Sequence, residues 1–260
     1  MTSRVVLIVA AIAALCASTR AQNAAAPAFD VVSIKENTSG ADGGGAGPRG
    51  QDRWVATNVP LRSLLATAWS IPADRVEAPD WTRVTRYDID ARGSVANGWD
   101  DIRTKAQTLL RDRFKAAVHV EQRTLPTYDL LRLPPGRPGP SLRESPIKDC
   151  FDRAAIAAMK PPPRPCMMTF GNGTLTGTMT IKDLTVTLTG ASGRPVFDKT
   201  GLPGNYEVDL KWTPTLRDDA AGDAVSIFTA VQEQLGLKLE NATAPLDVLI
   251  VDHVERPTAN

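Results

Sequence analysis

Four blocks of sequence occur twice in this chain, in the same order and about 120 positions apart. The first block lies in residues 54–64 and matches residues 174–184. The apolar positions of the two coincide: Val55 with Leu175, Val59 with Met179, Leu61 with Ile181, and Leu64 with Leu184. An ordered set of this kind predicts a tandem duplication, which restricts the chain to folds in which one unit is built twice.

The remaining blocks keep the same order: residues 87–90 with 206–209, residues 110–121 with 231–240, and Pro126 with Pro245, each proline preceding an apolar run. The spacing of apolar residues within each copy indicates two strands, a helix, two strands, a second helix and two further strands. We therefore predict an α+β fold with two tandem copies of this unit, built mainly from antiparallel sheets with helices packed on one face.

The copies are expected to occupy residues 29–133 and 166–257. Between them, residues 134–165 are rich in proline. Because proline removes a backbone donor and fixes φ, this segment is predicted to be an extended linker without regular structure.

Each copy is predicted to begin with a hairpin. Residues 29–36 and 54–58 would form the first, joined by a glycine-rich loop. Residues 166–170 and 174–179 would form the second, closed by the tight turn Gly-Asn-Gly at 171–173.

One stretch gives conflicting signals. Residues 185–189 read Thr-Val-Thr-Leu-Thr, which by propensity favours a strand. The matching residues 65–69 belong to a helical pattern, and tertiary context often overrides propensity. We therefore predict a helix over residues 181–189.

Residues 1–21 resemble a secretory signal, with Arg4 before an apolar run and small residues up to Ala21. The apolar run is far shorter than the ~20 residues needed to span a bilayer. We expect a Sec-type signal peptide cleaved near Ala21, a periplasmic or secreted protein, and no stable membrane insertion after cleavage. Acylation of Cys16 is the alternative, which Leu15 disfavours because a small residue normally precedes a lipidated cysteine.

Cleavage would leave Cys150 and Cys166, and two cysteines in an exported protein most simply form a disulfide. A catalytic or metal-binding pair is the alternative, although the spacing matches neither a C-x-x-C motif nor a zinc knuckle. The net charge of +1 argues against a nucleic-acid partner.

Eight motifs lie along the chain, at residues 29–35, 56–61, 78–81, 86–91, 110–114, 194–206, 232–239 and 251–257. Together they resemble an uncharacterised acidobacterial soil-protein family, whose members are exported, internally duplicated and present in many copies per genome. The resemblance implies no established activity. Related domains of that family are attached to membrane sensor peptidases, which implies a role in sensing or interaction outside the cytoplasm.

Two pairs of carboxylates recur in the duplicated strands: Asp88 with Asp90, and Glu207 with Asp209. Residues two apart lie on one face of a strand, so each pair could bind a divalent cation or act as acid and base. The alternative is an ordinary solvated strand face, with the intervening apolar residues turned inward.

The glycine-dense residues 39–50 lack the Gly-Lys-Ser/Thr ending of a phosphate-binding loop and have no counterpart in the second copy. They are either a flexible hairpin insertion or a flap that covers a ligand. In the second case, Asp42, Arg49 and Trp54 are the candidate ligand contacts.

No catalytic residue and no cofactor is predicted. We expect a non-enzymatic exported module that binds an envelope protein or a cell-surface ligand. A secreted hydrolase that uses dispersed carboxylates or a histidine, His119 or His253, is one alternative, and a divalent-cation-binding structural protein is another.

Overall fold

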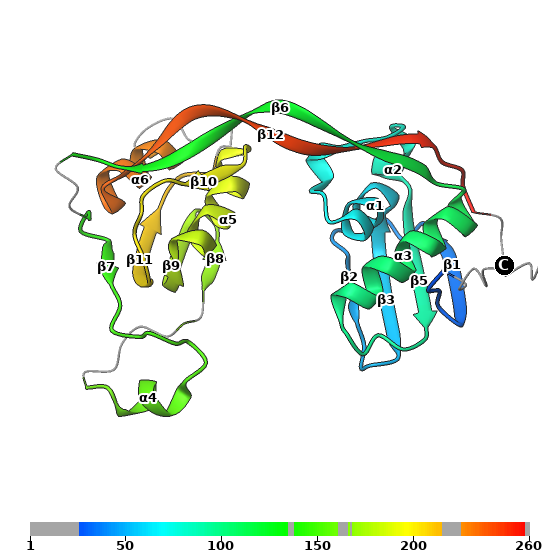
Figure 1. Cartoon of the computed structure of the whole chain (residues 1–260), viewed down its shortest axis with the longest axis horizontal. Helices are drawn as coiled ribbons and strands as arrows, with labels where there is room; N and C mark the ends of the chain where they lie inside the picture. The colour runs from blue at the N-terminus through cyan, green and yellow to red at the C-terminus, as the bar shows by residue number, and fades with distance from the viewer. Residues whose placement is uncertain (1–25, 135–137, 161–165, 167, 215–224, 258–260) are drawn as a thin grey trace, which may run out of the picture. The chain divides into compact units, whose positions relative to one another are not determined.

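The computed structural model describes residues 26–134, 138–160, 166, 168–214 and 225–257. Within them it has six α-helices and three sheets whose strands pair mostly antiparallel, so the predicted α+β class is confirmed (Figure 1). The chain forms two compact units, each described below by itself. Unit 1 contains the chain up to His119 together with the residues from Leu249 onward, and unit 2 contains Val120–Val248. The predicted signal peptide, residues 1–21, lies outside the described residues.

Unit 1 is built on a four-stranded antiparallel sheet with the order β1-β5-β3-β2. Its strands are β1 (Val31–Asn37), β2 (Gly45–Pro48), β3 (Arg53–Pro60) and β5 (Arg86–Arg92). Its helices are α1 (Leu61–Trp69), α2 (Trp81–Val84) and α3 (Trp99–Phe114), with a 3₁₀ turn at Ala73–Arg75. Buried residues of α1 and α3, among them Leu64 and Leu110, pack with Ile89 of the sheet in one core.

The predicted first hairpin is wrong. Strand β5 lies between β1 and β3, and the glycine-rich loop itself supplies β2, which pairs with β3. The pairing of β1 with β5 places Ile34 opposite Ile89 and Lys35 opposite Asp88. Favourable cross-strand pairs therefore select a distant partner, and the long loop imposes no tight turn that would force neighbours in sequence to pair.

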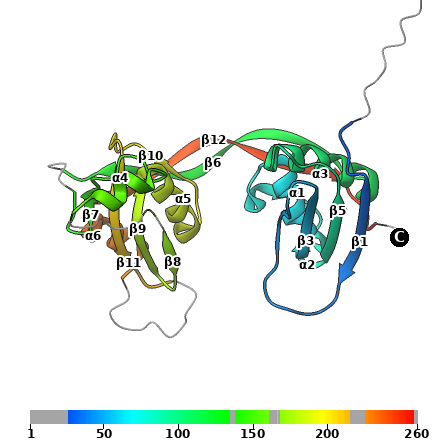
Figure 2. The same ribbon diagram turned by 90° about the horizontal axis from the view of Figure 1, so that it is seen from below.

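Unit 2 repeats this arrangement with a sheet of order β7-β11-β9-β8 (Figure 2). Its strands are β7 (Leu142–Glu144), β8 (Thr169–Gly171), β9 (Thr174–Thr180) and β11 (Asn205–Lys211). Its helices are α4 (Arg153–Ala158), α5 (Ile181–Ser192) and α6 (Ile227–Leu235). The predicted second hairpin is confirmed where β8 pairs with β9 around Asn172 and Gly173, whose φ angles are 47° and 75°. The predicted helix over residues 181–189 is also confirmed as part of α5.

The segment between residues 134 and 165 differs from the extended linker expected. Its described residues include β7, which pairs with β11, and the short helix α4. The side chains of Leu142 and Ile147 are buried, at 1% and 0% exposure. Leu142–Glu144 contains no proline, so its backbone can join the sheet while its apolar side chain enters the core.

A third sheet has the order β10-β6-β12-β4. It consists of β4 (Val76–Glu77), β6 (Ala117–Arg132), β10 (Val196–Asp198) and β12 (Leu237–His253). In unit 1, β4 pairs parallel with the end of β12, Val76 opposite Leu249, and in unit 2, β10 pairs parallel with β6, Val196 opposite Tyr128.

The long strands β6 and β12 differ from the sequence-based expectation in two respects. The two closing strands predicted for each copy are single long strands, because β6 continues through Pro126 and β12 through Pro245. The compact units also differ from the expected copies, since the end of β12 belongs to unit 1 and most of β6 to unit 2. Burial of Leu249 beside Val76, each 0% exposed, accounts for this placement.

Candidate functional site

The disulfide inferred from the sequence is present. Cys150 and Cys166 are bonded, with their Cα atoms 5.6 Å apart. The bond closes a segment in unit 2 that includes α4.

Asp88 lies on β5, where its carboxylate is held by protein donors. Oδ1 and Oδ2 accept hydrogen bonds from Nδ2 of Asn37 at 2.9 and 3.0 Å, and Oδ1 also accepts from the backbone N–H of Asn58 at 2.8 Å. The buried amide of Asn58 donates in turn to the carbonyl oxygens of Ala41 and Gly43. Asp88 therefore helps to anchor the glycine-rich segment to the sheet.

Asp90 lies two residues further along β5 and forms an ion pair with Arg53. Its Oδ1 accepts from Nε of Arg53 at 2.7 Å, and its Oδ2 accepts from Nη2. The hydrogen bond from Arg53 lowers the pKa of Asp90. This bidentate pair joins β3 to β5, so the carboxylate of Asp90, a candidate cation ligand by sequence, already has a cationic partner.

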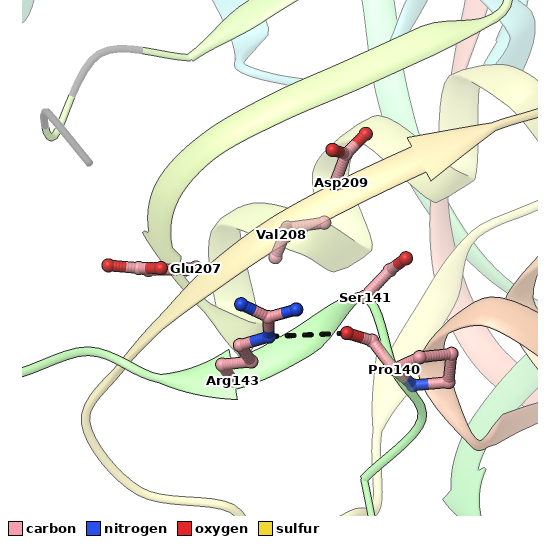
Figure 3. Close-up of a pocket in the computed structure, with 6 residues that line it drawn as sticks. All are labelled: Pro140, Ser141, Arg143, Glu207, Val208 and Asp209. Carbon is pink, nitrogen blue, oxygen red and sulfur yellow. Dashed lines mark hydrogen bonds between the residues drawn. The ribbon is translucent and has the colours of Figure 1, made fainter. Parts of the chain in front are cut away.

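Glu207 and Asp209 of β11 line a small pocket together with Pro140, Ser141, Arg143 and Val208 (Figure 3). Its volume is about 60 Å³, room for a few water molecules. The two carboxylates point in different directions, and Nε of Arg143 donates to the carbonyl oxygen of Pro140 at 3.3 Å. Among the described residues, no three Cys, His, Asp or Glu side chains are grouped as a metal site requires.

The three flap candidates are not brought together as ligand contacts. Asp42 and Arg49 are exposed, whereas Trp54 is 1% exposed and belongs to the core of unit 1. The ring of Trp54 stacks on Phe29, with centroids 5.9 Å apart and planes 9° from parallel. Trp54 therefore serves packing.

A larger depression lies in unit 2 at the β8–β9 hairpin. We call it the aromatic groove, with a volume of about 320 Å³ and the lining residues Phe170, Gly171, Asn172, Gly173, Gly190, Ala191, Trp212, Thr213, Pro214 and Ile227. The rings of Phe170 and Trp212 lie 6.2 Å apart, centroid to centroid, at 30°. Phe170 is 61% exposed, which is unusual for a large apolar side chain beside a concave surface.

The hairpin holds the groove in shape. The carbonyl oxygen of Gly173 accepts a hydrogen bond from the backbone N–H of Trp212 at 2.8 Å. A Cβ atom at Gly173 would lie 2.0 Å from the carbonyl oxygen of Trp212, and its φ of 75° disfavours other residues. Only glycine therefore allows this close approach of the hairpin to the end of β11.

A family model described as "Protein of unknown function (DUF3738)" matches residues 62–254. The chain belongs to this family. Neither a curated protein nor a solved structure matches this chain. The region matched by DUF3738 includes the aromatic groove, both disulfide cysteines and the four strand carboxylates, but not the glycine-rich segment.

No sequence pattern singles out Phe170 and Trp212 as a pair. The nearest signal is the Gly-Asn-Gly turn at 171–173, which predicts the hairpin but not the segment that the hairpin approaches. Trp212 follows β11 directly, and only the tertiary contact with Gly173 places it beside Phe170.

Proposed function

We propose that this protein is an exported, non-enzymatic binding or protein-interaction module of the cell envelope, with the aromatic groove of unit 2 as its ligand site. The observation that carries the proposal is the exposed Phe170 beside the half-buried Trp212 in a concave surface. Aromatic side chains supply large contact areas at low entropic cost and dominate many binding sites.

The composition of the groove favours a flat or apolar group as ligand. Its volume of about 320 Å³ falls at the lower end of the range of small-molecule sites. Small residues, Gly190 and Ala191, form the α5 side, and Asn172 and Thr213 add polar side chains to the lining. The site accommodates one ring or one branched side chain of a larger partner.

The environment of the carboxylates favours binding over hydrolysis. A general acid or base must be available to the substrate, and its pKa lies near the working pH. Asp90 is paired with Arg53, which lowers its pKa, and Asp88 accepts three hydrogen bonds from protein donors. The interactions of Asp88 and Asp90 therefore hold strands and loops of unit 1 together.

Export and duplication belong to the same proposal. A disulfide of this kind persists in oxidising compartments, in agreement with a Sec-type signal at residues 1–21 and a periplasmic or secreted protein. The strand orders of the two sheets, β1-β5-β3-β2 and β7-β11-β9-β8, are equivalent. This equivalence supports descent from one duplicated ancestor, as in the exported acidobacterial proteins that the sequence resembles.

The proposal is tested by crosslinking and pull-down from the native envelope, followed by affinity measurements on the recovered component. Phe170→Ala and Trp212→Ala should each weaken binding about tenfold or more, because each removes a ring from the groove. Trp99→Ala is the matched control, since Trp99 is 41% exposed but lies in unit 1. Equal effects of all three substitutions, or turnover of an envelope polymer by the purified protein, would contradict the proposal.

A further inference from the structure

Strand β8 ends the sheet of unit 2 without a residue that discourages further pairing (Figure 2). An edge strand turns backbone N–H and C=O groups to the outside, and natural proteins guard such edges with charged side chains or proline. Six strands end the three sheets of the described residues, and five of them carry such a residue: Lys35 in β1, Pro48 in β2, Glu77 in β4, Arg143 in β7 and Asp198 in β10. Strand β8 reads Thr-Phe-Gly after Met168, and therefore carries none.

The hydrogen bonds of the hairpin determine which backbone groups of β8 face outward. The N–H of Trp212 donates to the carbonyl oxygen of Gly173, so Gly173 faces β11. Successive residues of a strand turn their N–H and C=O groups to opposite sides, so Leu175, two residues on, also faces β11. Leu175 lies opposite Phe170, and this pair is therefore not hydrogen-bonded. The N–H and C=O groups of Phe170 point away from β9, and by the same alternation so do those of Met168.

The side chains along this edge are uncharged and accessible. Met168 and Phe170 lie on one face, because side chains alternate along a strand, and they are 47% and 61% exposed. Thr169 lies between them on the opposite face and is also exposed. The edge therefore combines outward-facing backbone groups with uncovered apolar area.

We propose that β8 pairs antiparallel with β8 of a second copy of this chain, giving a dimer with a twofold axis at Thr169. In this register, Met168 of each copy lies opposite Phe170 of the other. The outward N–H and C=O groups of these residues then form hydrogen bonds in both pairs.

The side chains of the edge select a second copy as the partner. The twofold axis brings the sulfur of Met168 against the ring of Phe170 twice, which is a favourable contact. It also brings Thr169 opposite Thr169, a favourable cross-strand pair. Two copies of one surface carry the same charges, so only an uncharged edge such as β8 avoids repulsion in a symmetric contact. Because β8 is short, we expect a weak dimer, with a dissociation constant between about 10 μM and about 1 mM.

The test measures the mass of the purified protein, recovered after export, by analytical ultracentrifugation over that concentration range. The mass should rise from one chain to two. Thr169→Lys and Thr169→Glu should each weaken the dimer about fivefold or more, because like charges then lie directly opposite each other. An equal mixture of the two variants should recover dimers, because opposite charges then face each other. No ligand is added, so the result is independent of the ligand proposed for the aromatic groove.

Thr57→Lys and Thr57→Glu are the matched controls, because Thr57 is an exposed threonine on β3 in unit 1. They make the same changes in charge and should leave the dimer unchanged. Thermal unfolding of the parent and the four variants should agree, which separates pairing from folding. A mass of one chain at every concentration, or equal effects at Thr57 and Thr169, would overturn the proposal. So would a mixture that stays as dissociated as either Thr169 variant alone.

Discussion

At the scale of single residues, Asn58 shows how one side chain fixes a local departure from regular structure. It has a φ of 55° and lies where the register between β3 and β5 shifts, between Ala56 and Val59. This left-handed conformation suits asparagine better than most residues, and it turns the buried amide toward the glycine-rich segment. The opposite side of the contact needs glycine, since a Cβ at Gly44 would lie 2.1 Å from the carbonyl oxygen of Asn58.

Asn58→Ala is expected to lower the free energy of unfolding by about 1–3 kcal/mol more than Asn172→Ala, measured by urea denaturation. Both positions have positive φ, at 55° and 47°, so both substitutions strain the backbone. Asn58 alone has a buried amide that donates to two carbonyl oxygens. Similar losses for both variants would mean that the backbone conformation, and not the hydrogen bonds, accounts for the effect.

The Arg53–Asp90 ion pair predicts a dependence of stability on pH. Because Arg53 lowers the pKa of Asp90 in the folded state, the stabilisation is present above the ordinary aspartate value of about 3.9. It is lost as the pH falls through the lower folded value. A double-mutant cycle with Arg53→Gln and Asp90→Asn should therefore give a coupling at neutral pH that disappears in strong acid. A coupling that is constant over this range would contradict the assignment.

At the scale of elements, α5 forms against the propensity of its own residues. Thr185, Val186 and Thr187 are β-branched, yet they lie within a helix whose first turn is stabilised by a capping box. The hydroxyl of Thr180 accepts from the backbone N–H of Asp183 at 3.1 Å, and the carboxylate of Asp183 accepts from that of Thr180, also at 3.1 Å. Burial of Leu184 and Leu188 then fixes the face that packs on the sheet.

Thr180→Ala is expected to lower the free energy of unfolding by about 1 kcal/mol, because it leaves the N–H of Asp183 without its side-chain acceptor. Thr187→Ala is the control within the same helix. It replaces a β-branched residue by the best helix former, so stability should be unchanged or rise by about 0.5 kcal/mol. Chemical denaturation of both variants measures the difference, and a loss at Thr187 equal to that at Thr180 would count against the cap.

The elements also show what sequence patterns can and cannot predict. Local signals predicted α5 and the hairpin around Asn172, because periodicity, a matched second copy and turn chemistry act within a few residues. They failed for β1, whose partner β5 is more than fifty positions away in the chain. They also missed the aromatic groove, because Phe170 and Trp212 meet only through the folded hairpin.

At the scale of the whole molecule, unit 1 is completed by the end of a strand, β12, from outside its main run of sequence, whereas unit 2 is one continuous run. Unit 1 contains the chain end from Leu249, and unit 2 contains most of β6. In unit 1 the backbone N–H of Glu255 donates to the carbonyl oxygen of Phe114 at 2.7 Å, and the guanidinium of Arg256 lies 5.6 Å from the centre of the Trp81 ring. Residues 249–257 are therefore part of the fold of unit 1.

Leu249→Ala and Leu130→Ala are a matched pair that tests this division. Both leucines are 0% exposed on a long strand, Leu249 beside β4 in unit 1 and Leu130 beside β10 in unit 2. Each substitution should cost about 2–5 kcal/mol, because it leaves a cavity in a packed core. Hydrogen exchange should rise in β4, α1 and α3 for the first variant and in β10, α5 and α6 for the second, since local opening follows the cooperative unit. If Leu249→Ala instead loosened the neighbours of Leu130, the chain end would not be an integral part of unit 1.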